Sequence, residues 1–425
     1  MRILHLIQRY WPARGGAESH LGELSARLAA EGHQVTVATT NALDFELFWD
    51  RRSRRVVGAK ETYNDVRILR FPVRHLPGSS LTYAGVRRFL WLLSMARPVP
   101  VGVLFRLARF TPWVPDLERW LVTTDEPFDL VAGMTICFEP LIEMGLRFAR
   151  RRGLPFVSYP LTHLGAGSRP GTDALSRFYT MRHQVALVRD SDAAVVQTPA
   201  EGTFYASLGI SLARLVVGGP GVAPAEVLGG DRARFRQRHN LQGPVVVSLS
   251  AMSYDKGTIH LVQAVRRLWR EGRQVDLVLA GAVLAPFQHY LSTLPEADAR
   301  RLKVLGPVDD AEKRDMLAAA DIFAMPSRTD SFGIVYLEAW LYRLPVIAAR
   351  TWGVSDVVSD GEDGLLVPFG DVPALAQVLN RLLDHPVEQA ALGSRGEQKV
   401  YRQYTWEHRY APVRDLYARL IGSGR

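Results

Sequence analysis

Residues 326–353 read PSRTDSFGIVYLEAWLYRLPVIAARTWG, and this stretch decides the fold. The apolar run Ile322-Phe-Ala-Met immediately before it predicts a buried strand. Asp330-Ser331 can cap a helix, and apolar residues then recur at helical spacing: Ile334, Val335, Leu337, Trp340, Leu341 and Leu344. Pro345 closes that helix, and Val346-Ile-Ala-Ala predicts the next strand. The stretch is therefore a strand–loop–helix–strand unit of a parallel sheet.

Two carboxylates flank the start of this helix, Asp330 in the loop and Glu338 on the helix. At roughly 1.5 Å of rise per residue they lie too far apart for a close acid/base pair, but they can hold two ends of an extended ligand. The helix N-terminus between them favours phosphate. A ligand with hydroxyls at each end and phosphate in the middle is a nucleotide sugar. An N-cap aspartate and a solvated helix glutamate remain the alternative on this pair alone.

The residues around the pair resemble the donor-site signature of the retaining glycosyltransferases of family 4. The matching pattern is Asp330-x7-Glu338 with Phe332-Gly333 inside it, followed by Leu344-Pro345-Val346. Asp330 stands where most members carry Glu. The resemblance implies an α/β protein of the GT-B fold, with two Rossmann-like doubly wound parallel-sheet domains that face each other across a cleft. It also implies that the donor contacts Asp330, Ser331, Phe332, Gly333, Ile334 and Glu338.

A second donor element lies after the predicted strand at 245–250. Lys256-Gly257 opens a helix there, which puts the lysine beside a phosphate at that helix N-terminus. The segment resembles the family motif GRLxxxKG, whose Arg and Lys hold the donor diphosphate. Ala251 stands where the Arg is expected. Arg328, or Arg9 or Arg14 near the N-terminus, can supply the missing charge.

The chain begins with a predicted strand at 3–7, a loop, a helix at about 17–30 and a strand at 35–38. Gly15-Gly16 lies in the loop, where a backbone without Cβ lets a ligand approach closely; a simple tight turn is the alternative. The loop resembles the family motif PxxGGxE, which closes over donor phosphates or acceptor.

His163 follows the predicted strand 155–159 in the segment PLTHLGAG. Residues just beyond the carboxyl end of a parallel strand face the ligand crevice. A lone histidine is more often structural, but family members place an active-site histidine at this strand end. The resemblance therefore implies that His163 positions the transferred sugar, together with Lys256 and Asp330 as the other catalytic residues.

The motifs divide the chain into three parts. Residues 1–220 are expected to form an acceptor-binding domain and residues 221–402 a nucleotide-sugar-binding domain. Residues 403–425 are expected to form a helix that crosses back to the first domain.

Composition narrows the possible classes of protein further. The 425 residues are 47% hydrophobic and 22% charged, as in ordinary globular proteins. The single cysteine, Cys137, excludes an internal disulfide framework, and the eleven histidines show no metal-ligand spacing. We therefore expect no metal and no cofactor beyond the donor. A net charge of +9 suits an anionic donor, an anionic membrane or nucleic acid, and no nucleic-acid module is recognisable. Without a signal-peptide pattern or a spanning apolar run, we expect a cytoplasmic protein.

The stretch 84–121 alternates large apolar residues with arginines: Arg87, Arg88, Arg97, Arg106 and Arg109. Ordinary core-facing helices are one interpretation. The other is an interfacial basic segment that touches anionic lipid, which would place the protein at the inner face of the membrane.

Together these features predict a metal-independent transferase that moves a sugar from a UDP- or GDP-type donor to a glycan or lipid-linked acceptor with retention. Two alternatives stay open. One is a sugar-nucleotide epimerase of the same fold, and the other is a non-catalytic nucleotide-sugar or membrane-binding protein. The absent arginine at position 251 favours the latter.

Overall fold

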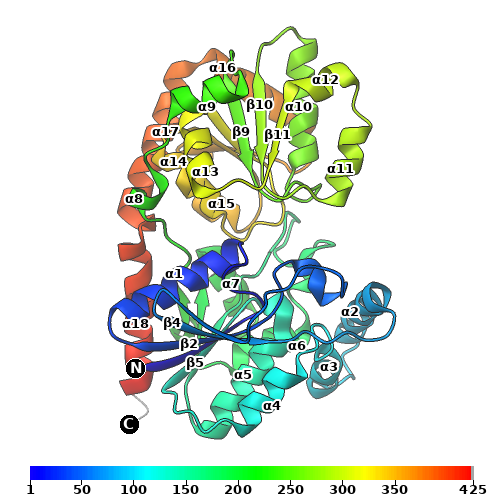
Figure 1. The fold of residues 1–425 in the computed structure, drawn as a ribbon, viewed down its shortest axis with the longest axis vertical. Coiled ribbons are helices and arrows are strands. Elements are labelled where there is room, and N and C mark those ends of the chain that lie inside the picture. Colours follow the sequence, from blue (N-terminus) through cyan, green and yellow to red (C-terminus); the bar gives the residue numbers. More distant parts are fainter. Residues whose placement is uncertain (423–425) are drawn as a thin grey trace. The chain divides into compact units, whose positions relative to one another are not determined.

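The computed structural model describes residues 1–422, which form two compact α/β units (Figure 1). The first unit comprises Met1–His163, Gly171–Gly219 and the chain from Tyr410 onward. The second comprises Leu164–Pro170 and Pro220–Arg409. Each unit has its own sheet. Within the described residues the first sheet is parallel apart from one edge strand and the second is parallel throughout, which confirms the predicted class of two Rossmann-like domains.

The first sheet has eight strands within the described residues, in the order β3-β4-β2-β1-β5-β6-β7-β8. Its strands are β1 Arg2–Ile7, β2 Gln34–Thr40, β3 Lys60–Tyr63, β4 Val66–Phe71, β5 Leu130–Met134, β6 Phe156–Tyr159, β7 Ala193–Val196 and β8 Leu215–Val217. The strand order reverses between β1 and β5. Their carboxyl ends therefore flank the switch point where such sheets bind ligands.

The helices of the first unit are α1 Gly16–Ala30, α2 Ser79–Met95, α3 Val101–Ala108, α4 Pro115–Thr123, α5 Glu139–Arg152, α6 Arg182–Asp190 and α7 Pro199–Ser207. Sequence patterns did not predict the edge strand β3. It pairs antiparallel with β4 through a tight turn at Asn64 and Asp65, whose φ angles are 50° and 58°. Asn and Asp tolerate this left-handed conformation, so the Asn-Asp pair is the local signal for the hairpin.

The second sheet has the order β11-β10-β9-β12-β13-β14 within the same described residues. Its strands are β9 Val245–Leu249, β10 Asp276–Ala280, β11 Leu302–Gly306, β12 Ile322–Met325, β13 Val346–Ala349 and β14 Gly364–Val367. Its helices are α8 Pro224–Val227, α9 Arg232–His239, α10 Thr258–Arg270, α11 Ala285–Ser292, α12 Glu296–Arg301, α13 Asp310–Ala319, α14 Ile334–Leu341, α15 Val354–Val357, α16 Val372–Asp384 and α17 Pro386–Lys399. The order reverses between β9 and β12.

Both faces of the second sheet are covered by apolar side chains. Val247 of β9 packs in a cluster with residues of α13 and α14, while its neighbour Val246 packs in another with residues of α10 and α16. Successive strand residues point to opposite faces, so a sheet buried on both sides requires a continuous apolar run. The run Val245-Val-Val meets this requirement.

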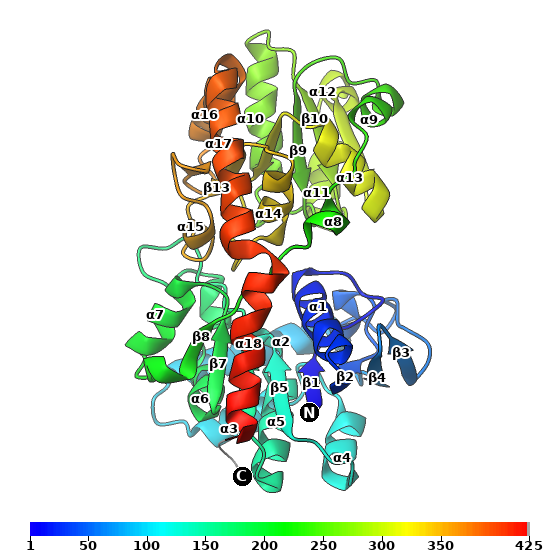
Figure 2. The ribbon, with the colours of Figure 1, turned by 90° about the vertical axis from the view of Figure 1, so that its left-hand side faces the viewer.

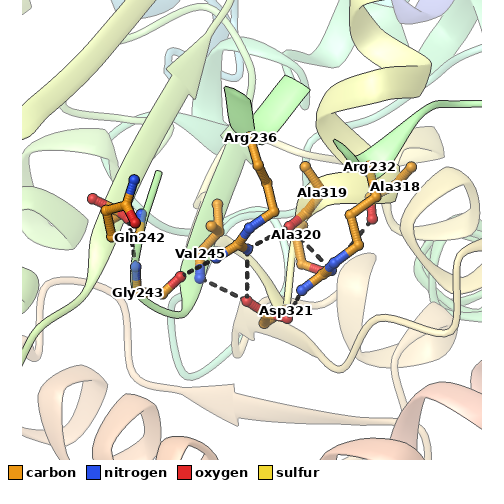
Figure 3. A network of polar contacts seen from close by, with 10 residues as sticks. Arg232, Arg236, Gln242, Gly243, Val245, Ala318, Ala319, Ala320 and Asp321 are labelled. Atoms are coloured by element: carbon orange, nitrogen blue, oxygen red, sulfur yellow. Dashed lines mark hydrogen bonds and ion pairs between the residues drawn. The ribbon is translucent and has the colours of Figure 1, made fainter. Parts of the chain in front are cut away.

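An arginine network fixes the amino ends of these strands (Figure 3). Arg232 donates to the carbonyls of Ala318, Ala319 and Ala320 at the end of α13 and pairs with Asp321 at 2.9 Å. Asp321 in turn accepts from the Val245 backbone N–H at 2.8 Å. These contacts satisfy helix carbonyls and align β9 with β12 at the edge opposite the expected ligand site.

The last helix, α18 Trp406–Gly422, is drawn in red in Figure 2. From Tyr410 onward it belongs to the first unit. There the Tyr417 hydroxyl contacts Nε2 of His5 at 3.2 Å and the hydroxyl of Tyr159 at 2.8 Å. Burial lowers the pKa of His5 to about 3, so this imidazole is neutral at physiological pH. The network fastens α18 to β1 and β6.

The stretch 84–121 forms helices α2, α3 and α4, and one face of α2 does pack inward. Leu90 of α2 is buried with Leu104 and Ala108 of α3. Arg87, which one of the two sequence interpretations assigned to a lipid-facing segment, is paired with the fully buried Glu139 of α5. Arg87 therefore anchors α2 to the unit. The opposite face of α2 is exposed and includes Arg88.

Candidate functional site

The predicted donor residues of the second unit gather at the carboxyl ends of β9 and β12, the switch point of its sheet. The loops after these strands touch closely: a Cβ on Gly257 would lie 2.2 Å from the Pro326 carbonyl oxygen. Gly257 also has φ of 74°, in the left-handed region. Only glycine meets both conditions, which explains the Lys-Gly pair.

Lys256 and Asp330 form an ion pair in this place, with Nζ 2.8 Å from Oδ1. Their side chains are 25% and 17% exposed, so the pair is partly shielded yet accessible to a ligand. The sequence predicted that both residues touch the donor but did not predict that they touch each other. A lysine ammonium has three N–H donors, so Lys256 can keep Asp330 and still donate to a phosphate.

Arg328 lies in the same loop as Asp330. Its Nε and one terminal nitrogen donate to Oδ1 of Asp255 at 2.8 and 2.6 Å. Its guanidinium carbon is also 4.9 Å from the ring centroid of Phe369 and 5.4 Å from that of Tyr254. These contacts hold Arg328 beside the loop that carries Lys256. Arg328 is one of the three arginines that the sequence offered in place of the absent arginine.

Helix α14 begins at Ile334, later than the sequence predicted, and Gly333 occupies its N-cap. Asp330 and Ser331 do not cap it; they remain in the loop, and Asp330 instead pairs with Lys256. Gly333 has φ of 85°, and a Cβ there would lie 2.3 Å from the ring of Tyr336. The glycine therefore lets the chain turn sharply into the helix. Within the first turn, the Tyr336 N–H donates to the Gly333 carbonyl at 3.0 Å.

Glu338 lies about one turn into α14, and Lys313 of α13 contacts it. Lys313 Nζ is 2.8 Å from Glu338 Oε1, and the side chains are 22% and 12% exposed. Sequence reasoning missed Lys313. The available signal was its place in the first turn of α13. That helix begins at the carboxyl edge of the sheet, as does the helix that carries Glu338.

In the first unit, Gly15 lies between β1 and α1 as predicted, whereas Gly16 is already the first residue of α1. A Cβ on Gly15 would lie 2.2 Å from Oε2 of Glu18. The Glu18 carboxylate therefore occupies the space that any larger residue at position 15 would need. Arg9 fixes this carboxylate, with Nε 2.9 Å from Oε1, and also donates to the Leu43 carbonyl.

Arg9 is therefore engaged within the first unit, and its guanidinium carbon also lies 3.3 Å from the ring centroid of Phe45. Its side chain is 6% exposed. This environment makes Arg9 a poor substitute for the absent arginine. Arg14, the other candidate in this loop, is exposed.

His163 follows β6 in the first unit and is partly buried, with its ring centroid 4.5 Å from that of Tyr179. The preceding residue fixes its backbone: the Thr162 N–H donates to Glu201 at 2.6 Å. Glu201 is buried, and burial raises the pKa of its carboxyl group. His163 belongs to the first unit, whereas Lys256, Asp330 and Glu338 belong to the second.

Within residues 1–422, no three His, Cys, Asp or Glu side chains are grouped so that they could hold a metal ion. The two loop aspartates of the second unit are each paired with a cation, Asp330 with Lys256 and Asp255 with Arg328.

Two family models match the chain. Residues 15–221 match the glycosyl transferase 4-like domain, and residues 231–399 match glycosyl transferases group 1. A GDP-mannose-dependent monoacylated α-(1-6)-phosphatidylinositol monomannoside mannosyltransferase of Corynebacterium glutamicum is 33% identical over 39% of this chain and 44% of its own length. An MMP α-(1→4)-mannosyltransferase of Mycolicibacterium hassiacum is 26% identical over 99% of this chain and 98% of its own length.

The match to the first of these relatives spans less than half of that protein. Among solved structures, Anabaena HepE in complex with UDP and glucose superposes with a TM-score of 0.70 at 21% identity, covering 98% of this chain and 99% of HepE. This similarity concerns the fold. With its two doubly wound sheets, the donor-site signature and both family models, the chain belongs to the group 1 glycosyltransferases of GT-B fold, similar to family 4.

Proposed function

We propose that this protein transfers a hexosyl group from a nucleotide-diphosphate sugar to a glycan or lipid-linked acceptor, with retention at the anomeric carbon. One observation carries the proposal: Lys256, Asp330 and the N-terminus of α14 meet at the switch point of the second sheet. That arrangement offers a cation and helix N–H groups for phosphate, and a carboxylate for sugar hydroxyls.

Each residue then has a distinct role. Lys256, the amides at Phe332 and Gly333 and the guanidinium of Arg328 stabilise the negative charge that develops on the departing diphosphate. Asp330 accepts hydrogen bonds from hydroxyls of the transferred sugar, and Glu338 accepts them from the ribose. His163 positions the transferred sugar and stabilises its positive character. Gly15 and Gly16 let the first-unit loop approach the donor or acceptor closely.

Donor and acceptor classes rest on the relatives. The Corynebacterium relative is named for GDP-mannose and a phosphatidylinositol monomannoside, and HepE was solved with UDP. We therefore propose a GDP- or UDP-type donor and a glycan or lipid-linked acceptor for this chain.

Thermal-shift titration with UDP, GDP and ADP, followed by turnover assays with the matching sugar donors, tests the function. The correct nucleotide should raise Tm, because a ligand that binds only the folded state stabilises it by mass action. Transfer should require an acceptor, and NMR of the product should show the donor's anomeric configuration. Rapid donor turnover without acceptor would favour an epimerase. Binding without product against every acceptor would favour a non-catalytic protein.

Activity should be unchanged in EDTA. The diphosphate charge is met by Lys256, Arg328 and helix amides, while both loop aspartates already hold cations of the chain itself. The protein is first dialysed to remove bound metal. The initial rate of sugar transfer is then measured with and without EDTA. Abolition by EDTA and recovery on adding Mg²⁺ or Mn²⁺ would contradict this expectation.

Our proposal for the acceptor's location rests on helices α2 and α3, which lie in contact at the margin of the first unit (Figure 1). The exposed face of α2 carries Leu81, Phe89, Leu92 and Met95, of which Leu81 is 83% exposed. Exposed arginines border it: Arg88, Arg97, Arg106 and Arg109. No Asp or Glu occurs between Asp65 and Asp116.

An apolar helix face bordered by exposed arginines complements an anionic lipid surface. Of these arginines, Arg109 is paired with Glu118 at 2.7 Å. We therefore propose that α2 and α3 hold the protein at the inner face of the cytoplasmic membrane, beside a lipid-linked acceptor. Within residues 1–422, no helix is long and apolar enough to cross a membrane.

The protein should bind phosphatidylglycerol vesicles at low salt and dissociate as salt rises. Arg88→Glu combined with Arg106→Glu should weaken binding about 10- to 30-fold, since each basic residue near the surface contributes roughly 1 kcal/mol. Phe89→Ser combined with Leu92→Ser should also weaken vesicle binding, because it removes apolar side chains that would enter the lipid surface. Vesicle flotation measures both.

Arg87 and Trp91 are unsuitable probes of this surface. Arg87 is bound to Glu139, and the guanidinium of Arg177 lies 4.2 Å from the Trp91 ring centroid. Arg402→Glu, an exposed arginine of the second unit, is the matched charge control and should bind normally. Absence of flotation at low salt would show that the surface does not bind lipid and would favour a soluble acceptor.

A further inference from the structure

Lys313 is the charged residue at the candidate donor site that the proposed roles leave unused. It lies in the first turn of α13, and its Nζ is 2.8 Å from Oε1 of Glu338 on α14. Asp310 of the same helix is a more distant carboxylate partner, with Oδ1 at 3.7 Å. Glu338 therefore has the closer and better-directed contact with this ammonium group.

The two helices hold this pair in a fixed place. Met316 and Leu317 of α13 are buried in the same apolar cluster as Leu337 and Trp340 of α14. Both helices begin at the carboxyl edge of the sheet, after β11 and β12. The Glu338 side chain is only 12% exposed, and a carboxylate so far withdrawn from water needs a compensating partner.

We infer that Lys313 is a positioning residue that prepares Glu338 to accept the ribose hydroxyls of the donor; this inference rests on the proposed function. The ammonium group occupies one site on Oε1 and leaves Oε2 and the remaining lone pair of Oε1 for a vicinal diol. It thereby fixes the rotation of the carboxylate.

The ammonium group also acts through its charge. A donor diphosphate carries negative charge, and an uncompensated Glu338 in a partly buried site would repel it. Paired with Lys313, the carboxylate is neutralised, so the ribose contact is made without an electrostatic cost to the diphosphate. Lys313 thus acts through Glu338, and it need not touch the donor.

The test compares binding of a nucleoside diphosphate with binding of its 2′-deoxy counterpart by calorimetry. The unmutated protein should prefer the ribonucleotide about tenfold, as expected when a hydroxyl bonded to a charged group is lost. Lys313→Met, which keeps the side-chain length without the charge, should reduce this preference to about twofold. Lys313→Arg should restore part of it.

A double-mutant cycle separates the routes by which Lys313 could act. In a Glu338→Ala background, Lys313→Met should change ribonucleotide affinity less than twofold. An equal loss in both backgrounds would overturn the proposal, since Lys313 would then act directly or through another group. A lower Tm with unchanged ribose preference would also overturn it, by showing a purely structural role.

Lys60→Met is the matched control, because Lys60 is an exposed lysine of the first unit and should leave binding unchanged. If the unmutated protein binds no nucleoside diphosphate at all, the proposed function itself fails and the role of Lys313 fails with it. If it binds ribo- and deoxyribonucleotides equally, only the ribose contact and its positioning residue fail.

Discussion

Replacing Lys256 with alanine should lower kcat about 10²- to 10³-fold, the usual effect of removing one pre-positioned donor that stabilises transition-state charge. The effect should exceed that of a typical surface cation because Ala251 stands where the family motif carries an arginine. It should also appear mainly in kcat, since the charge on the departing diphosphate develops during bond cleavage. Steady-state kinetics with saturating donor measures it.

The Lys256 variant also leaves Asp330 without its cation, so its fold must be checked by Tm. Lys256→Arg should recover part of the activity because the charge remains. Lys60→Ala is the control for the loss of one lysine, because Lys60 lies in the first unit and Lys256 in the second. A loss of less than about fivefold in the alanine variant would remove Lys256 from the group that stabilises the departing phosphate.

Replacing Glu338 with alanine should weaken nucleoside diphosphate binding roughly 10- to 150-fold, which corresponds to about 1.5–3 kcal/mol for a hydrogen-bonded charge. The fold should be retained, because the carboxylate contacts Lys313 at the edge of the unit and takes no part in the apolar cluster. Titration calorimetry gives the affinity.

The exposed Glu362 offers a matched control for Glu338, since Glu362→Ala removes a carboxylate from the same unit without touching the candidate site. An unchanged affinity in the Glu338 variant would exclude this carboxylate from the nucleotide contact. The nucleotide-sugar interpretation would then rest on Lys256 and Asp330 alone.

Much of the fold could be predicted because its signals are local. The stretch 326–353 contains a helix with apolar residues at helical spacing between two short apolar runs, and the structure has β12, α14 and β13 there. Periodicity of this kind depends on neighbours within a few residues. Family resemblance located the candidate donor loops for the same reason, because Gly257 and Gly333 are required by local backbone geometry.

The errors arose where two distant segments decide the outcome. Asp330 looked like a helix cap, but a lysine 74 residues earlier in the chain takes its carboxylate. Arg87 looked like part of an exposed basic stripe, but it pairs with Glu139, 52 residues later. Sequence spacing contains no information on such partners.

The sequence by itself determined two Rossmann-like sheets, most of their strands and the loops that carry Gly15, Lys256 and Asp330. Helical and strand periodicity, glycine conformation and helix N-termini are all set by short-range sterics and hydrogen bonding. Only the tertiary structure decided which charges pair and which helix faces stay exposed. Long side chains such as those of Arg87 and Lys313 are compatible with either water or a partner. The packing of α2 on α3 and α6, and the shared apolar cluster of α13 and α14, bring Glu139 and Glu338 within reach.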